Sequence, residues 1–129
     1  MKRLLLTLVF AASAAGLPAY AHHSFAADYF ENQTLSIRGE LIEFEYRSPH
    51  TWVHVQAKDD KGQMQRFAAE WANPNRLARQ GITKDTLKAG DYVVLTGSPS
   101  RNPGEYKLHL KSIERPADGW KSGMARSRQ

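Results

Sequence analysis

Cysteine is absent from this sequence of 129 residues. Without cysteine the protein has no disulfide framework and no thiolate metal site, and it has no side chain that could carry the lipid of a lipoprotein. Its stability must therefore come from the packing of apolar side chains. Any bound metal ion must be held by nitrogen or oxygen ligands.

A hydrophobic run long enough to span a membrane is also missing. Residues 4–12 are apolar, but they fall short of the about 20 helical residues that a bilayer core requires. This stretch follows a basic start at residues 1–3 and precedes the small residues 19–21, which is the pattern of a secretory signal. We therefore predict cleavage after Ala21 and a periplasmic or secreted mature protein with no membrane span and enough residues for one domain.

The body of the chain has little net charge, although the whole chain carries a formal charge of +5. Residues 22–118 hold thirteen basic and thirteen acidic residues, so the positive excess lies in the signal peptide and the C-terminal tail. A neutral body in an exported protein argues against a nucleic-acid partner.

Common catalytic signatures are missing as well. The sequence contains no glycine-rich phosphate loop, no G-x-S-x-G motif and no H-E-x-x-H motif. We therefore predict a protein that is not an enzyme. The one enzymatic alternative is an oxidase that acts through a copper ion held by a terminal histidine.

Alternation of apolar and polar residues predicts five strands. The first, over residues 34–46, changes phase near Gly39, which indicates a bulge or bend. Turn signals and a capped helix start separate the later elements. We expect the remaining strands at residues 51–57, 64–71, 92–97 and 106–113, and a short helix at residues 75–80 after Asn73-Pro74.

This order of elements predicts a mostly β fold, a small OB-like five-stranded β-barrel with a short helix between strands three and four. A six-stranded sandwich or an open roll is the alternative. The domain occupies residues 34–116, after an N-terminal segment at residues 22–33. Residues 117–129 are expected to form a flexible polar tail.

The mature N-terminus would begin with two histidines, His22 and His23. The α-amine and ring of His22 can chelate one ion, and a further imidazole would complete an all-nitrogen set that favours copper(II). Ligands of one ion lie within about 5 Å of each other, so the segment that starts at His22 must fold back onto another histidine. We predict a copper(II) site formed by His22, His23 and His50.

The other histidines are weaker candidates. His54 is the second choice of partner, but His50 and His54 are about 13 Å apart along a strand and cannot both bind one ion. His109 is expected to be a solvated strand residue. The alternative for the terminus is an unstructured end, at which His22 and His23 bind metal as any histidine pair would.

A second hypothesis is a non-enzymatic binding module for a small molecule, an envelope glycan or a protein partner. Trp52, with Tyr46 and His54, would form an exposed patch at the lip of the barrel, where OB folds bind ligands. The structural interpretation is that Trp52 covers a face of the sheet. Glu70 is expected to be a solvated strand residue.

Several spaced motifs resemble domain of unknown function 6152, a family of small exported bacterial proteins. They are His22-His23-Ser24-Phe25, Pro49-His50-x-Trp52, Glu70, Asn75-x-Leu77-x-x-x-Gly81-x-Thr83 and Leu87-x-x-Gly90-Asp91. The resemblance spans roughly residues 22–113 and departs at Ser48 and Ile82, where the family commonly has Asn and often has Trp. It implies export and a β-barrel domain, assigns no activity, and puts forward His22, His23 and His50.

Overall fold

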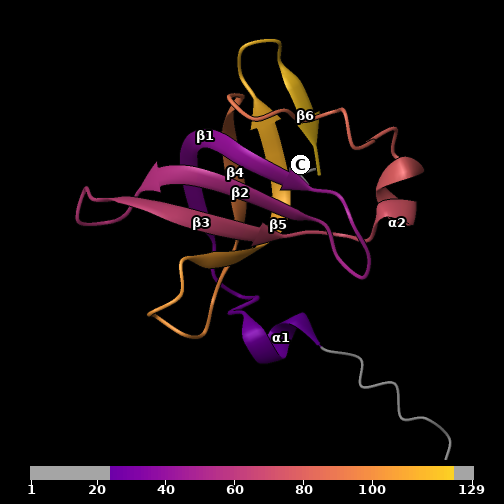
Figure 1. The fold of residues 1–129 in the computed structure, drawn as a ribbon. Coiled ribbons are helices and arrows are strands. Elements are labelled where there is room, and N and C mark those ends of the chain that lie inside the picture. Colours follow the sequence, from indigo (N-terminus) through magenta and orange to yellow (C-terminus); the bar gives the residue numbers. More distant parts are fainter. Residues whose placement is uncertain (1–23, 124–129) are drawn as a thin grey trace, which may run out of the picture.

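The alternating segments form strands in the computed structural model, which describes residues 24–123 (Figure 1). Each predicted strand and the predicted helix are present, with ends that shift by at most two residues. The elements in chain order are α1 (Phe25–Asp28), β1 (Leu35–Glu45), β2 (Trp52–Lys58), β3 (Met64–Glu70), α2 (Pro74–Ala78), β4 (Tyr92–Pro99), β5 (Lys107–Arg115) and β6 (Trp120–Ser122).

Five of these strands close into a barrel. β1 pairs antiparallel with β2 and β4, β2 pairs with β3, and β4 pairs with β5. A parallel pairing of β3 with β5 closes the ring, and in it Glu70 lies opposite His109. With α2 between β3 and β4, this arrangement confirms the mostly β, OB-like barrel that the sequence predicted.

β1 bends because it belongs to both halves of the barrel. Its first half pairs with β4 and its second half with β2, and the two pairings overlap at Gly39 and Glu40. The register with β2 shifts between Leu41 and Glu43, which is the bulge that the change of phase predicted. Glycine is required at the overlap, because a β-carbon on Gly39 would lie 2.2 Å from the carbonyl oxygen of Gln56.

The core fills the inside of the barrel. Apolar residues at alternate strand positions are buried there, as a period of two residues predicts. The polar residues between them therefore point to the outer surface. The side chains without exposed surface include Val53, Val55, Ala69, Val93, Leu95 and Leu108.

α2 begins where its sequence predicts. Oδ1 of Asn73 accepts a hydrogen bond from the amide of Arg76 at 2.9 Å, and Pro74 occupies the first turn, where its missing N–H costs nothing. Leu77 is fully buried and packs into the core cluster of the barrel. α2 is therefore held at both its N-terminus and its apolar face.

The C-terminal segment differs from the flexible tail that was predicted from residue 117. Residues Trp120–Ser122 form β6, which pairs antiparallel with the end of β5. Three residues are too few to show a periodic pattern in the sequence, and their hydrogen-bond partners come from the edge of β5. The prediction of flexibility was therefore wrong for these residues.

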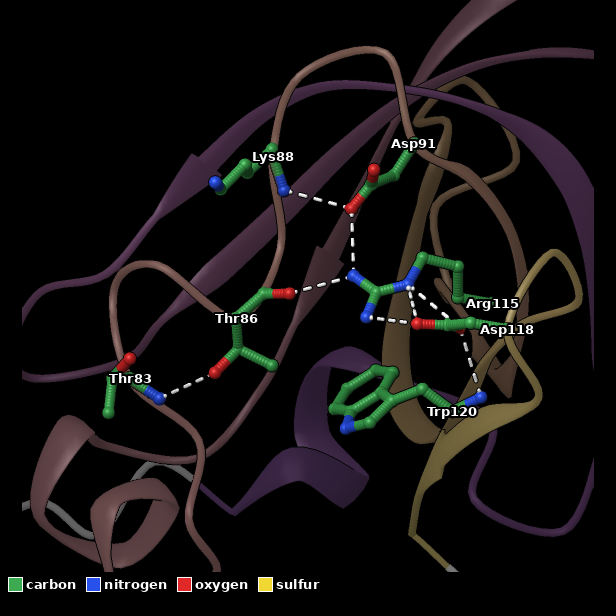
Figure 2. A network of polar contacts seen from close by, with 7 residues as sticks. All are labelled: Thr83, Thr86, Lys88, Asp91, Arg115, Asp118 and Trp120. Atoms are coloured by element: carbon green, nitrogen blue, oxygen red, sulfur yellow. Dashed lines mark hydrogen bonds and ion pairs between the residues drawn. The ribbon is translucent and has the colours of Figure 1, made fainter.

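Arg115 holds the turn that leads to β6 (Figure 2). Its guanidinium donates to Asp91 at 3.0 Å and to Asp118 at 2.9 Å. It also donates to the carbonyl oxygen of Thr86 at 2.8 Å and lies over the ring of Trp120. One side chain thus joins β5, the turn before β6 and the loop that precedes β4.

α1 and the residues after it lie against the loop between β4 and β5, at the lower end of the barrel in Figure 1. The amide of Phe30 donates to the carbonyl oxygen of Pro99 at 2.9 Å. The amide of Arg101 donates to the carbonyl oxygen of Asp28, also at 2.9 Å. The side chain of Arg101 also donates to the carbonyl oxygen of Ala26 at 2.8 Å. The N-terminal segment is therefore part of the folded domain.

Candidate functional site

The hairpin of β2 and β3 brings His50 to Glu70. Its register pairs Trp52 with Glu70, and two further backbone hydrogen bonds of Thr51 extend the ladder toward His50. Nδ1 of His50 lies 2.7 Å from Oε1 of Glu70. The Glu70 side chain is only 14% exposed, so the expectation of a solvated glutamate was wrong.

Tyr29 engages the other oxygen of Glu70. The hydroxyl of this fully buried tyrosine donates to Oε2 of Glu70 at 2.5 Å. Burial and the hydrogen bond to the Glu70 carboxylate raise the pKa of Tyr29, so its hydroxyl keeps the proton and stays a donor. With both oxygens engaged, the carboxylate is held in one orientation toward His50.

This carboxylate sets the chemistry of the His50 ring. A carboxylate only accepts hydrogen bonds, so Nδ1 of His50 carries the proton and the lone pair of the neutral ring lies on Nε2. Within residues 24–123 no hydrogen bond reaches Nε2 of His50, and the His50 side chain is 33% exposed. Metal-binding histidines are commonly held by such a carboxylate partner.

A second imidazole and carboxylate pair lies beside the first. The parallel pairing of β3 and β5 places His109 opposite Glu70, and Nδ1 of His109 lies 2.8 Å from Oε1 of Glu31. Lys111 pairs with the other oxygen of Glu31. Burial lowers the pKa of His109, although the hydrogen bond with Glu31 opposes that shift.

His109 is therefore not the solvated strand residue that the sequence predicted, and its side chain is only 16% exposed. The error has a physical cause. His109 points away from the core, as its place in the alternation requires, but the segment that contains α1 covers this part of the outer surface of β5.

Phe25 of α1 contacts both imidazoles. Its ring stacks on that of His109 with 3.6 Å between the centroids, and its centroid lies 5.4 Å from that of His50. The part of the N-terminal segment that the structure describes thus folds back onto two histidines. His22 and His23 themselves, the other two predicted metal ligands, lie outside the described residues.

Two residues of the predicted aromatic patch form local contacts. Trp52 is partly exposed, and the ammonium group of Lys107 lies 5.9 Å from the centroid of its ring. Nε2 of His54 lies 3.0 Å from Oε2 of Glu45, and Nδ1 of His54 is buried without a hydrogen-bond partner. The two rings are stacked, with 6.4 Å between their centroids.

Tyr46, the third member of that patch, contacts the segment that contains α2 instead. Its hydroxyl proton is shared between the carbonyl oxygens of Pro74, at 3.0 Å, and of Ile82, at 2.9 Å. It therefore ties the end of β1 to the segment that contains α2, and its hydroxyl already has two backbone acceptors.

Sequence reasoning assigned no role to Phe25, Tyr29 or Glu31. These residues lie in a segment without periodicity, so no pattern indicated that they would cover the barrel. The available signal was the presence of Phe25 and Glu70 among the motifs that resemble a known family.

No group of three or more His, Asp or Glu side chains within residues 24–123 is arranged to hold a metal ion. A metal site at His50 would therefore need ligands from outside this range. None of the helices in the same range is both long and apolar enough to cross a membrane.

Comparison with known proteins shows a matching family and similarity to a solved structure. The model of a family of unknown function, DUF6152, matches residues 10–108 of the chain. No curated protein matches it. The crystal structure of the mitochondrial single-stranded DNA binding protein Rim1 from S. cerevisiae is similar with a TM-score of 0.46 and 17% identity, over 64% of this chain and 91% of that chain.

Proposed function

This chain belongs to DUF6152, a family of unknown function, and we propose that it is an exported periplasmic accessory protein that binds copper(II). The ligands are the α-amine and ring of His22, freed by cleavage after Ala21, together with His23 and Nε2 of His50. An all-nitrogen set that includes an aliphatic amine favours copper(II) over other divalent ions.

The hydrogen bond between His50 and Glu70 carries this proposal. It leaves Nε2 of His50 as the nitrogen with a free lone pair, and it fixes the direction in which that lone pair points. Tyr29 fixes the carboxylate in turn. A histidine that merely faced solvent would need neither of these buried partners.

The short chain distance between His23 and Phe25 is a second observation that supports the proposed copper site. Phe25 contacts the ring of His50, and His23 precedes Phe25 by two residues. Whatever the conformation between them, the α-carbons of His23 and Phe25 are within about 7.6 Å of each other. This short span to a residue that contacts His50 supports the choice of His23 as a further ligand.

The partial exposure of His50 agrees with an accessory role. An ion bound at Nε2 would lie near the protein surface, where it can exchange with another protein or with solvent. The sequence carries no catalytic signature that would indicate turnover of a substrate.

The terminus itself provides the test. A chain that begins at His22 should bind copper(II) more tightly, by at least about tenfold, than a chain with one extra methionine before His22, because the added residue removes the amine chelate. Affinities are measured by competition with a chromophoric chelator. His50→Ala should weaken binding in the authentic chain, whereas His54→Ala is the matched control and should not.

Equal affinities for the two N-termini would refute the proposed site. The mass of the protein recovered from the periplasm gives the cleavage position independently. A mature chain that begins at any residue other than His22 would also contradict the proposal.

A further inference from the structure

A cleft with a volume of about 340 Å³ opens between α1, α2 and β5. His50, the predicted copper ligand that the structure describes, is not among its lining residues. Six of the side chains that line it come from four separate segments of the fold. They are Phe25, Trp71, Arg76, Gln80, Leu110 and Lys111.

The polar side chains that line this cleft include hydrogen-bond donors and cations, and His109, which is paired with Glu31, lines it as well. Arg76 on α2, Gln80 just after it and Lys111 on β5 all line the cleft, and no carboxylate of residues 24–123 does. Lys111 is already paired with Glu31. No carboxylate within residues 24–123 forms an ion pair with Arg76, so its guanidinium is available for an anion.

The apolar side chains that line the cleft are well packed. Trp71 is 7% exposed and Leu110 is 3% exposed, so both are held firmly by the barrel. Phe25 is held by its stack on His109. A volume of this size lies at the lower end of the range for small-molecule sites, which combine apolar walls with a few polar groups.

We propose that this cleft binds a small carboxylate with a planar apolar body. Arg76 holds the carboxylate, since the planar fork of a guanidinium matches the two oxygens of that group. Trp71 and Phe25 contact the apolar body. One free guanidinium matches a single negative charge, which favours a monocarboxylate over a phosphate dianion.

Benzoate is a suitable probe, with acetate and inorganic phosphate for comparison. The whole exported protein is titrated without metal ions, with binding measured by calorimetry and by NMR shifts, so that the result does not depend on the copper site. Benzoate should bind more tightly than acetate or phosphate. The largest shifts should appear at the indole N–H of Trp71 and at Nε of Arg76.

A pair of variants on one helix tests the role of the guanidinium. Arg76→Gln should weaken benzoate binding by about tenfold, as loss of one charge-assisted pair predicts. It keeps the amide that Asn73 caps, so the helix start is preserved. Arg79→Gln removes an exposed charge that does not line the cleft, and it should bind benzoate as the unmodified protein does.

Three results would overturn the proposal. They are equal affinities in the Arg76→Gln and Arg79→Gln variants, benzoate that binds no better than acetate, and shifts that lie away from Trp71 and Arg76. Each of them would leave the copper site untouched, because that site is tested through the N-terminus and His50.

Discussion

Nδ1 of His50 lies 2.7 Å from Oε1 of Glu70, although twenty positions separate the two residues in the sequence. The contact follows from the hairpin register, which pairs Trp52 with Glu70 and continues through Thr51 toward His50. It turns an ordinary outward-facing glutamate into the partner that orients an imidazole.

Glu70→Gln should weaken copper(II) binding by about 10–100-fold, because a neutral amide orients Nδ1–H of His50 less firmly than the carboxylate does. Competition titration of the chain that begins at His22 measures the effect. Glu43→Gln is the matched control, since Glu43 is an exposed carboxylate paired with Arg66. The same loss in both variants would show that the pair with His50 is not its cause.

Tyr29→Phe should lower the free energy of unfolding by about 1.5–3 kcal/mol, the range for a hydrogen bond to a charged group. For a domain of this size that loss corresponds to several degrees in Tm. Chemical denaturation measures it. Tyr106→Phe removes a hydroxyl from a side chain that is 40% exposed and should stay within about 0.5 kcal/mol. Similar values for both variants would contradict the structural role of the Tyr29 hydroxyl.

Arg115→Met should release β6 from the barrel, because it removes the bonds to Asp91 and Asp118 that hold the turn (Figure 2). We expect a loss of about 1–2 kcal/mol, since the Arg115 side chain is only 19% exposed. Hydrogen exchange should show faster exchange at residues 120–122. Lys121→Met removes an exposed ion pair and serves as the control, with unchanged exchange.

His109 should make stability depend on pH. Burial holds the pKa of His109 below its usual value of 6.5, so the unfolded chain takes up the proton first as the pH falls. The contribution of His109 is therefore fully present above about pH 6.5 and is lost as the pH falls through the lower pKa of the folded state.

Denaturant unfolding between pH 7.5 and 5, at intervals of about half a unit, measures this dependence. His109→Gln should flatten the fall in stability over that window, whereas Arg79→Gln should leave it unchanged. The pKa of Glu31 is also lowered, but Glu31 affects the pH dependence of stability only below its usual value of 4.5. The range from pH 7.5 to 5 therefore leaves its contribution out. An equally steep fall in His109→Gln would exclude His109 as the source.

The sequence by itself determined which residues form the five barrel strands and which face of each of them is inside. Burial of Val53 and Val55 depends on their own alternation, and the start of α2 depends on the neighbouring residues Asn73 and Pro74. The bulge in β1 was also visible, because a change of phase at Gly39 is a local signal. The copper ligands His22, His23 and His50 stay predictions that the titrations above can decide.

The tertiary structure alone decided which outward-facing residues become buried. Glu70 and His109 alternate like solvated residues, and they meet because β3 and β5 pair in parallel across a long connection. Phe25 and Tyr29 then cover them from a segment that has no periodicity. Alternation reports only whether a side chain faces the core of its own sheet. What packs on the outer surface depends on contacts between segments far apart in the chain, which no local pattern records.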